Sequence, residues 1–486
     1  MSKGLELNTY LDSFIKLMLC NENFKASQDT RNIIKYDDYF AILKPANDLL
    51  TQHPDIEIEK YCDLLLKNSK LIKYVKELIL TDYLASGMIV SYGTAYYSQT
   101  IIIGNQQETC FRTRKIVSKP EKMVSNSIFD LSSITKIFLS TLIIILDDQM
   151  IISLDDKIYD LDSRFINLKM VTIRDLLAFQ VSLKTEKRIE DCLDVTEAEK
   201  LLFTVKVEIN DDKSHFYSDI GAMVLKYMIE YVCEMDLYNV CKKYIFDKCK
   251  MLDTVVDVNE KDLSRTVSNN FERRIINGHY VEINNIFKGV VNDGKARFLN
   301  KKWKQMWGHS GLFSTSKDII SFCQNFILGN LLSIDKCNEI GVNRTGIKTL
   351  NVYKQYLGYL CYSKHPNSRD SEVNHCLSGN AIGLGGYTGN QLTIDVRNQL
   401  FVFLASNRCH NRVTSIFPSY DKQKYIVDLS DKKYVKWLDG KNYIYTQNFV
   451  YERDKIINEA VKLSIQCRYY EYIFGEKRIN AKIIKI

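Results

Sequence analysis

The start of one apolar segment constrains this chain more than any other feature. Residues 137–146 are apolar except for one Ser and one Thr, and Ser133 and Lys136 stand directly before them. Two residues three apart at a helix start lie on one face, one turn apart. A buried helix would therefore hold the hydroxyl of Ser133 beside the amino group of Lys136 in a fixed arrangement.

This pair indicates nucleophilic catalysis. A Ser hydroxyl is a weak nucleophile until a neighbouring base takes its proton. A Lys in a partly desolvated pocket can have its pKa lowered enough to serve as that base. The Ser-x-x-Lys pattern alone also arises by chance, and Ser is an ordinary helix cap. The support for catalysis therefore comes from segments further along the chain.

Length and composition indicate a folded protein of two or three domains. The chain has 486 residues, of which 45% are hydrophobic and 26% are charged. Its net charge of +7 is too small and too dispersed to indicate a nucleic-acid partner. The 13 cysteines are scattered without the spacing of metal ligands, so we expect reduced thiols and no metal site.

The apolar segments of the chain are too short for a signal peptide or a membrane span, and this predicts where the protein is located. The first residues contain no apolar stretch of signal-peptide length, and residues 137–146 are too short to span a bilayer. We therefore expect a cytoplasmic protein without membrane insertion. The sequence does not predict an oligomeric state.

Strand patterns lie on both sides of a helical middle. Residues 87–97 and 99–104 are rich in β-branched and aromatic side chains, which is typical of paired strands. Residues 389–395 alternate between apolar and polar, and residues 400–405 are a continuous apolar run. The pattern predicts an α+β fold, with an antiparallel sheet flanked by helices and a mainly helical insertion at about 140–300.

The chain divides into three predicted segments. Residues 1–65 show helical periodicity and form an N-terminal extension, residues 66–415 form the catalytic domain, and residues 416–486 form a C-terminal extension. Within the helical middle, Thr172 and Asp175 have the spacing of a capping box at a helix start.

Further motifs accompany the Ser-x-x-Lys pair. With residues 129–136, their order and spacing resemble the serine β-lactamase-like hydrolases, which include class C β-lactamases, D,D-carboxypeptidases, D-aminopeptidases and related esterases. The resemblance covers roughly residues 70–412 and implies the β-lactamase/transpeptidase-like fold. The segments that carry it are residues 215–221, 307–318, 382–390 and 406–408.

The resemblance implies a role for each matching residue. Ser133 would be the acylated nucleophile, and Lys136 would help to deprotonate it. Tyr217, in Tyr217-Ser218-Asp219, would be a general base and leaving-group acid. Taken alone, Tyr217 fits better as a structural residue ahead of a helix, and only the accompanying motifs favour catalysis. The oxyanion would be held by the backbone N–H groups of Ser133 and Tyr387.

The remaining site residues include departures from the family pattern. Leu384, Gly385 and Gly386 replace the family's Lys-Thr-Gly or His-Thr-Gly, and an apolar side chain can neither orient a carboxylate nor move a proton. Asp219 would line the substrate site with these residues. His309 is retained, and we interpret it as support for a loop near the site.

We predict a serine hydrolase that cleaves a small ester or peptide through an acyl-enzyme on Ser133 and needs no cofactor. The alternative is a weak or inactive family member that acts as a binding or regulatory protein, because of the change at Leu384. The glycine-rich residues 383–389 do not indicate a phosphate loop, because they lack the Lys-Ser/Thr ending and precede a strand.

Overall fold

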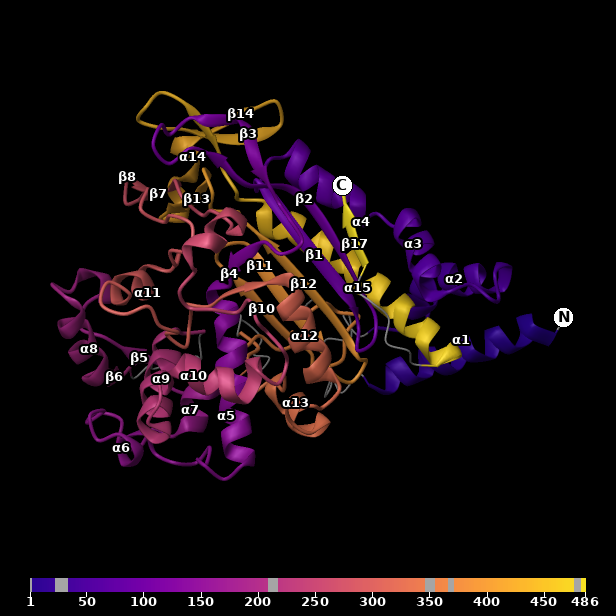
Figure 1. The fold of residues 1–486 in the computed structure, drawn as a ribbon, viewed down its shortest axis with the longest axis horizontal. Helices are drawn as coiled ribbons and strands as arrows, with labels where there is room; N and C mark the ends of the chain where they lie inside the picture. The colour runs from indigo at the N-terminus through magenta and orange to yellow at the C-terminus, as the bar shows by residue number, and fades with distance from the viewer. Residues whose placement is uncertain (1, 22–33, 209–216, 346–354, 366–370, 476–481) are drawn as a thin grey trace.

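A computed structural model of the chain describes residues 2–21, 34–208, 217–345, 355–365, 371–475 and 482–486. Its centre is a seven-stranded sheet with the order β10-β11-β12-β1-β2-β17, in which β3 also pairs with β2 (Figure 1). The strands are β1 (Gly87–Thr94), β2 (Ser98–Thr109), β3 (Ile116–Lys122), β10 (Ile382–Gly386), β11 (Asn390–Asp395), β12 (Leu400–Ser406) and β17 (Lys482–Lys485). Neighbours run antiparallel except β17, which runs parallel to β2.

Both faces of the central strands are buried, which explains their nearly continuous apolar sequences. On β12, Phe401 and Phe403 belong to one hydrophobic core, and Val402 and Leu404 belong to a second core on the other face. Alternate side chains of a strand point to opposite faces. A strand covered on both sides therefore needs apolar residues at every position, as residues 400–405 have.

The first face carries the helical region and the start of α5. The helix α5 lies in this core, with residues 135–146 all buried. The helices of this region are α5 (Thr135–Asp148), α6 (Ile158–Leu161), α7 (Ile173–Leu177), α8 (Val195–Phe203), α9 (Ile220–Cys233), α10 (Leu237–Cys241), α11 (Gly294–Leu299), α12 (Ser316–Ile327) and α13 (Ile334–Ile340).

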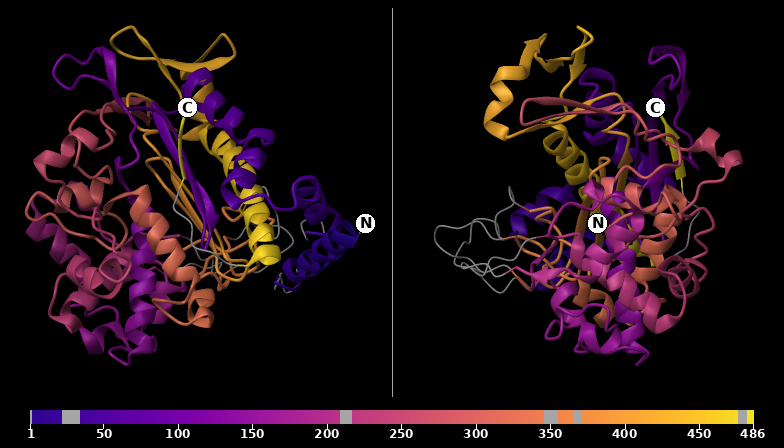
Figure 2. Two further views of the ribbon diagram at one scale, coloured as in Figure 1. Left: turned by 45° about the vertical axis from the view of Figure 1, so that its right-hand side comes forward. Right: turned by 90° about the vertical axis from the view of Figure 1, so that its left-hand side faces the viewer.

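The second face is covered by both ends of the chain. The long helix α15 (Phe449–Phe474) lies along the sheet, and the N-terminal helices pack beside it (Figure 2). Tyr469 donates to Asn47 Oδ1 at 2.8 Å, and Tyr61 donates to the carbonyl of Gln466 at 3.0 Å. The N-terminal helices are α1 (Ser2–Cys20), α2 (Tyr36–Gln52), α3 (Ile58–Asn68) and α4 (Leu71–Lys76).

Four small sheets complete the fold. The pair β4–β9 places the start of α5 beside residues 309–315, and Leu131 N–H donates to the Leu312 carbonyl at 2.9 Å. The remaining elements are β4 (Ile128–Asp130), β5 (Leu183–Lys184), β6 (Lys206–Val207), β7 (Glu272–Ile276), β8 (His279–Ile283), β9 (Phe313–Thr315), β13 (Val413–Phe417), β14 (Ile426–Leu429), β15 (Lys432–Lys436), β16 (Asn442–Ile444) and α14 (Lys422–Tyr425).

The predicted α+β class is confirmed, as are the paired strands β1 and β2. The capping box is also confirmed: Thr172 accepts from Asp175 N–H, and Asp175 accepts from Thr172 N–H. The region 140–300 is mainly helical but also contains the hairpin β7–β8. The division at residues 65 and 415 stays a prediction. Among the described residues, no helix combines the length and apolar character needed to cross a bilayer.

The packing of α2 against α15 predicts that the N-terminal extension unfolds together with the sheet. Leu43 is fully buried in the second core, so Leu43→Ala should lower the free energy of unfolding by about 2–5 kcal/mol. Leu17→Ala is the control. Because Leu17 is 44% exposed, this substitution should lower the free energy of unfolding by less than half as much as Leu43→Ala does. Urea denaturation followed by circular dichroism measures both. A separate early transition in Leu43→Ala, with the main transition unmoved, would contradict cooperative unfolding.

Candidate active site

The structure brings Ser133 and Lys136 together at the start of α5. A 3-10 turn, Ser132–Ile134, leads directly into the helix. The Nζ of Lys136 donates to Ser133 Oγ at 3.2 Å, and the Lys136 side chain is completely buried. The sequence predicts this arrangement because the two residues lie one helical turn apart ahead of a buried apolar run.

Lys136 makes an ion pair as well as the contact to Ser133. Its Nζ lies 2.7 Å from Asp219 Oδ1 and 3.3 Å from the carbonyl oxygen of His309. Burial is the largest influence on the pKa of Lys136 and lowers it, but Asp219 and Tyr217 together outweigh burial, so the pKa is raised above its ordinary value. Lys136 is therefore an ammonium group in the resting site, and not a free base.

Tyr217 lies in an aromatic stack beside that ammonium. Its ring is nearly parallel to Tyr362, with centroids 5.4 Å apart, and is 5.5 Å from Phe179. Lys136 Nζ lies 4.6 Å from the ring centroid. Burial raises the pKa of Tyr217, although Lys136 opposes the shift, so the residue is a neutral phenol. Within the described part of the chain its buried hydroxyl has no hydrogen bond of ordinary geometry, yet Lys136 and Ser133 lie close enough to oppose the rise of its pKa.

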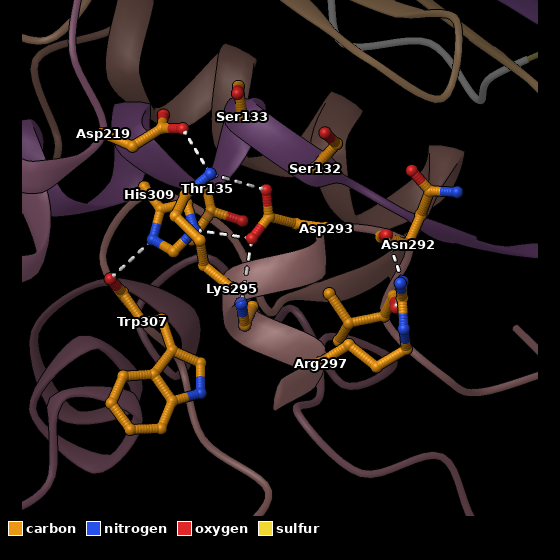
Figure 3. Close-up of polar contacts among 12 residues, drawn as sticks. Ser132, Ser133, Thr135, Asp219, Asn292, Asp293, Lys295, Arg297, Trp307 and His309 are labelled. Carbon is orange, nitrogen blue, oxygen red and sulfur yellow. Dashed lines mark hydrogen bonds and ion pairs between the residues drawn. The ribbon is translucent and has the colours of Figure 1, made fainter. Parts of the chain in front are cut away.

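A chain of alternating charges continues from Asp219, as Figure 3 shows. Lys295 Nζ lies 3.1 Å from Asp219 Oδ2 and 3.3 Å from Asp293 Oδ2. Asp293 Oδ1 is 2.9 Å from His309 Nε2, and His309 Nδ1 contacts the carbonyl of Trp307 at 3.1 Å. Despite their burial, the ammonium and imidazole neighbours hold the pKa of both Asp219 and Asp293 below the ordinary range.

Among these alternating charged residues, Lys295 is the one that the sequence analysis did not predict. Its signal is weak, because an Asp-x-Lys pattern at a helix start is common on protein surfaces. Asp219, Asp293 and His309 have ligand atoms within 4.8 Å of one another, which is the geometry of a possible metal site. Lys295 pairs with both carboxylates, however, and its ammonium supplies the positive charge that a metal ion would bring.

The strand β10 brings the Leu-Gly-Gly segment to the same place. Leu384 is fully buried in the core that contains α5, so its side chain packs rather than faces water. A Cβ added at Gly386 would lie 3.0 Å from the carbonyl oxygen of Leu131 and 3.3 Å from Ser132 Cβ. Gly386 therefore permits the close approach of β10 to the turn that carries Ser133. An added Cβ at Gly385 would lie 3.2 Å from Arg453 Nη1, on α15.

Tyr387 follows β10, and its backbone N–H is one of the two predicted oxyanion donors. This N–H donates to Ser132 Oγ at 3.2 Å. The Tyr387 hydroxyl donates to Glu272 Oε1 at 2.8 Å. The other predicted donor, Ser133 N–H, belongs to the first turn of a helix, where N–H groups lack intrahelical partners.

The turn before Ser133 is fixed by a buried carboxylate. Asp130 Oδ1 accepts from Ser132 N–H at 2.9 Å, and Oδ2 accepts from Asn292 N–H at 2.6 Å. Burial raises the pKa of Asp130 to about 6, against the lowering effect of these two N–H groups. Asn292 thus contributes to the site through its backbone N–H.

Comparisons with known proteins bear on the family and the fold. The β-lactamase family profile matches residues 101–416. The fold is similar to EstCE1, a hydrolase with promiscuous acyltransferase activity (12% identity, 80% of this chain and 98% of that chain, TM-score 0.56). It is also similar to simvastatin synthase from Aspergillus terreus (10% identity, 83% and 98%, TM-score 0.54) and a class C β-lactamase from Rhodobacter sphaeroides (15%, 70% and 94%, 0.52). None of the curated proteins matches the sequence.

The lowered pKa of Asp293 predicts a pH-dependent contribution to stability. A carboxyl group with a depressed native pKa contributes fully above its unfolded value of 3.8, and the contribution is lost as pH falls through the native value. Asp293→Asn should therefore destabilise the protein at pH 7, and the difference from wild type should shrink below about pH 4. Urea denaturation across this range measures it. Asp257→Asn is an exposed control, and an equal cost at all pH values would contradict the assignment.

Proposed function

Because the chain belongs to the β-lactamase family, we propose that it is a serine hydrolase that cleaves an ester or amide through an acyl-enzyme on Ser133. The observation that carries this proposal is the contact of 3.2 Å between Ser133 Oγ and the fully buried Nζ of Lys136. A Lys held there without exposure to water is costly to the fold unless it is paired. Catalysis gives a reason to keep the amine beside a hydroxyl.

The proposed reaction has two steps. Ser133 Oγ attacks the substrate carbonyl, its proton passes to the neutral form of Lys136, and the N–H groups of Ser133 and Tyr387 hold the oxyanion. The tetrahedral intermediate collapses, the carbonyl–oxygen or carbonyl–nitrogen bond breaks, and Tyr217 passes a proton to the leaving group. Water then gives a proton to the Tyr217 phenolate and attacks the acyl carbonyl. The acyl–Oγ bond breaks, the carboxylic acid leaves, and Ser133 Oγ takes its proton back from Lys136.

The charge state of the site favours an ester substrate. Lys136 and Tyr217 both hold their protons at rest, so little base is ready to activate Ser133. An ester makes the smaller demand on such a site, because its carbonyl is more electrophilic than that of an amide and its alkoxide leaves without prior protonation. Leu384 adds no further acid or positive charge. We therefore propose a small, neutral ester in preference to a peptide with a free carboxylate.

A second candidate function is a binding protein that turns over slowly or not at all. Two observations favour it: the apolar Leu384, and the hydrogen bond that Tyr387 N–H already makes to Ser132 at 3.2 Å. Both remove groups that would otherwise act on a substrate. Fold alone does not decide between the two functions.

The first test asks whether Ser133 is an activated nucleophile. The protein is incubated with an alkyl fluorophosphonate and analysed by intact-mass spectrometry beside Ser133→Ala. We expect one adduct on wild type and none on the variant, because the probe reacts with a deprotonated serine and not with an ordinary hydroxyl. A folded wild type without an adduct would contradict the hydrolase proposal and favour the binding protein.

The second test uses the raised pKa of Lys136. Only the neutral amine accepts the Ser133 proton, so the labelling rate of wild type should still rise with pH above pH 9. In Asp219→Asn, Lys136 stays buried but loses its carboxylate partner, so its pKa should fall. The midpoint of the pH dependence of labelling should therefore fall by about one to three pH units. The pH dependence of adduct formation measures the shift.

The matched control for this test is Asp293→Asn. It removes one carboxylate from the same chain of charges without touching Lys136. Its midpoint should stay close to that of wild type. Equal shifts in both variants, or no shift in Asp219→Asn, would show that Lys136 is not the titrating base.

A further inference from the structure

We propose that the hydroxyl of Ser132 occupies the oxyanion-binding position of the unliganded site, so that a substrate carbonyl must displace it before Ser133 is acylated. This inference rests on the proposed function. It assigns to Ser132, the neighbour of the nucleophile, a role as a positioning residue that limits entry to the site.

The contact that carries the inference is the hydrogen bond from Tyr387 N–H to Ser132 Oγ at 3.2 Å. An oxyanion donor works when it lies 2.7–3.1 Å from the position of the developing oxyanion. Ser132 Oγ lies at nearly this distance from Tyr387 N and accepts the hydrogen that an oxyanion would accept. A substrate oxygen and the Ser132 oxygen therefore compete for one donor.

The backbone holds Ser132 in this position. Its φ of +50° lies in the left-handed region, which is uncommon for a residue other than Gly. The Ser132 N–H is anchored to Asp130 Oδ1 at 2.9 Å. The carbonyl oxygen of Asp130 accepts from Asn390 Nδ2 at 2.8 Å and from Thr388 Oγ1 at 3.2 Å. The turn with Ser132 is thus fastened to the segment that presents Tyr387.

Space and orientation separate the roles of the two serines. Ser132 is 4% exposed, and Gly386 packs close to its Cβ, so its hydroxyl stays beside the end of β10. The two hydroxyls also have different partners: Ser133 Oγ accepts from Lys136 Nζ, and Ser132 Oγ accepts from Tyr387 N–H. Only Ser133 contacts Lys136, so Ser132 is a competitor for the oxyanion donor and not a second nucleophile.

The competition has a definite kinetic consequence. A neutral carbonyl gains little by replacing a neutral hydroxyl, whereas the charged oxyanion accepts a stronger hydrogen bond. The substrate must therefore break the hydrogen bond from Tyr387 N–H to Ser132 before its carbonyl can bind. This lowers the affinity for the substrate, and it also lowers the second-order rate constant of acylation. Removing the hydroxyl should raise the second-order rate constant about two- to tenfold, the equivalent of one ordinary hydrogen bond.

The test compares Ser132→Ala and Ser132→Gly with wild type. The second-order rate constant for Ser133 labelling by an alkyl fluorophosphonate is measured, because the phosphoryl oxygen of the probe needs the same donors. Both variants should label faster, and Gly also suits the positive φ if Ala impairs folding. The matched control is Ser140→Ala on α5, because Ser140 Oγ bonds only the Ile137 carbonyl of its own helix. Its labelling rate should equal that of wild type.

Hydrogen exchange gives a second measurement that needs no turnover. Peptides that contain Tyr387 should exchange faster in Ser132→Ala than in wild type, because the N–H loses its acceptor. Slower labelling in both variants would overturn the proposal and make the Ser132 hydroxyl a helper of the oxyanion. Unchanged labelling in both, with wild type reactive, would overturn the occlusion alone. No labelling of any folded form would overturn both the occlusion and the proposed hydrolase.

Discussion

The burial of one ammonium group organises this site. Lys136 lies at the start of an apolar helix with no exposed surface, and an unpaired charge in such a position costs several kcal/mol. Asp219 supplies the opposite charge at 2.7 Å, and Lys295 and Asp293 continue the alternation. The need to neutralise Lys136 therefore requires segments far apart in sequence to meet at the first turn of α5.

The strands of the fold fix the position of the turn that carries Ser133. The turn before Ser133 is held by β9 on one side and by the segment after β10 on the other. Gly386 allows the two to approach without a Cβ between them. The opposite face of the sheet is closed by α15 and the N-terminal helices, so the strands that present the site cannot shift independently of the chain ends. The extensions thus stabilise the site without contributing a reacting group.

Much of this could be predicted from local patterns. Continuous apolar runs predict α5 and β12, and the capping-box spacing predicts the helix that begins after Thr172. The spacing of Ser133 and Lys136 predicts their contact. The role of Lys295 could not be predicted, because one of its two partners, Asp219, lies 76 residues away in sequence, and only the folded chain joins them. The contact of Ser132 with Tyr387 N–H depends on the tertiary approach of β10, which no local pattern records.

The same ion pair that weakens Lys136 as a base strengthens it as a positive charge. An ammonium beside Ser133 stabilises negative charge that develops on a nearby oxygen, and it acts most strongly where water is excluded. Leu384 lies in the core beside α5 and brings no competing charge. The site therefore has electrostatic stabilisation but little capacity to move protons at neutral pH. Under the proposed function, an ester, whose alkoxide leaves without prior protonation, therefore suits this site better than an amide, whose amine would need a proton from Tyr217.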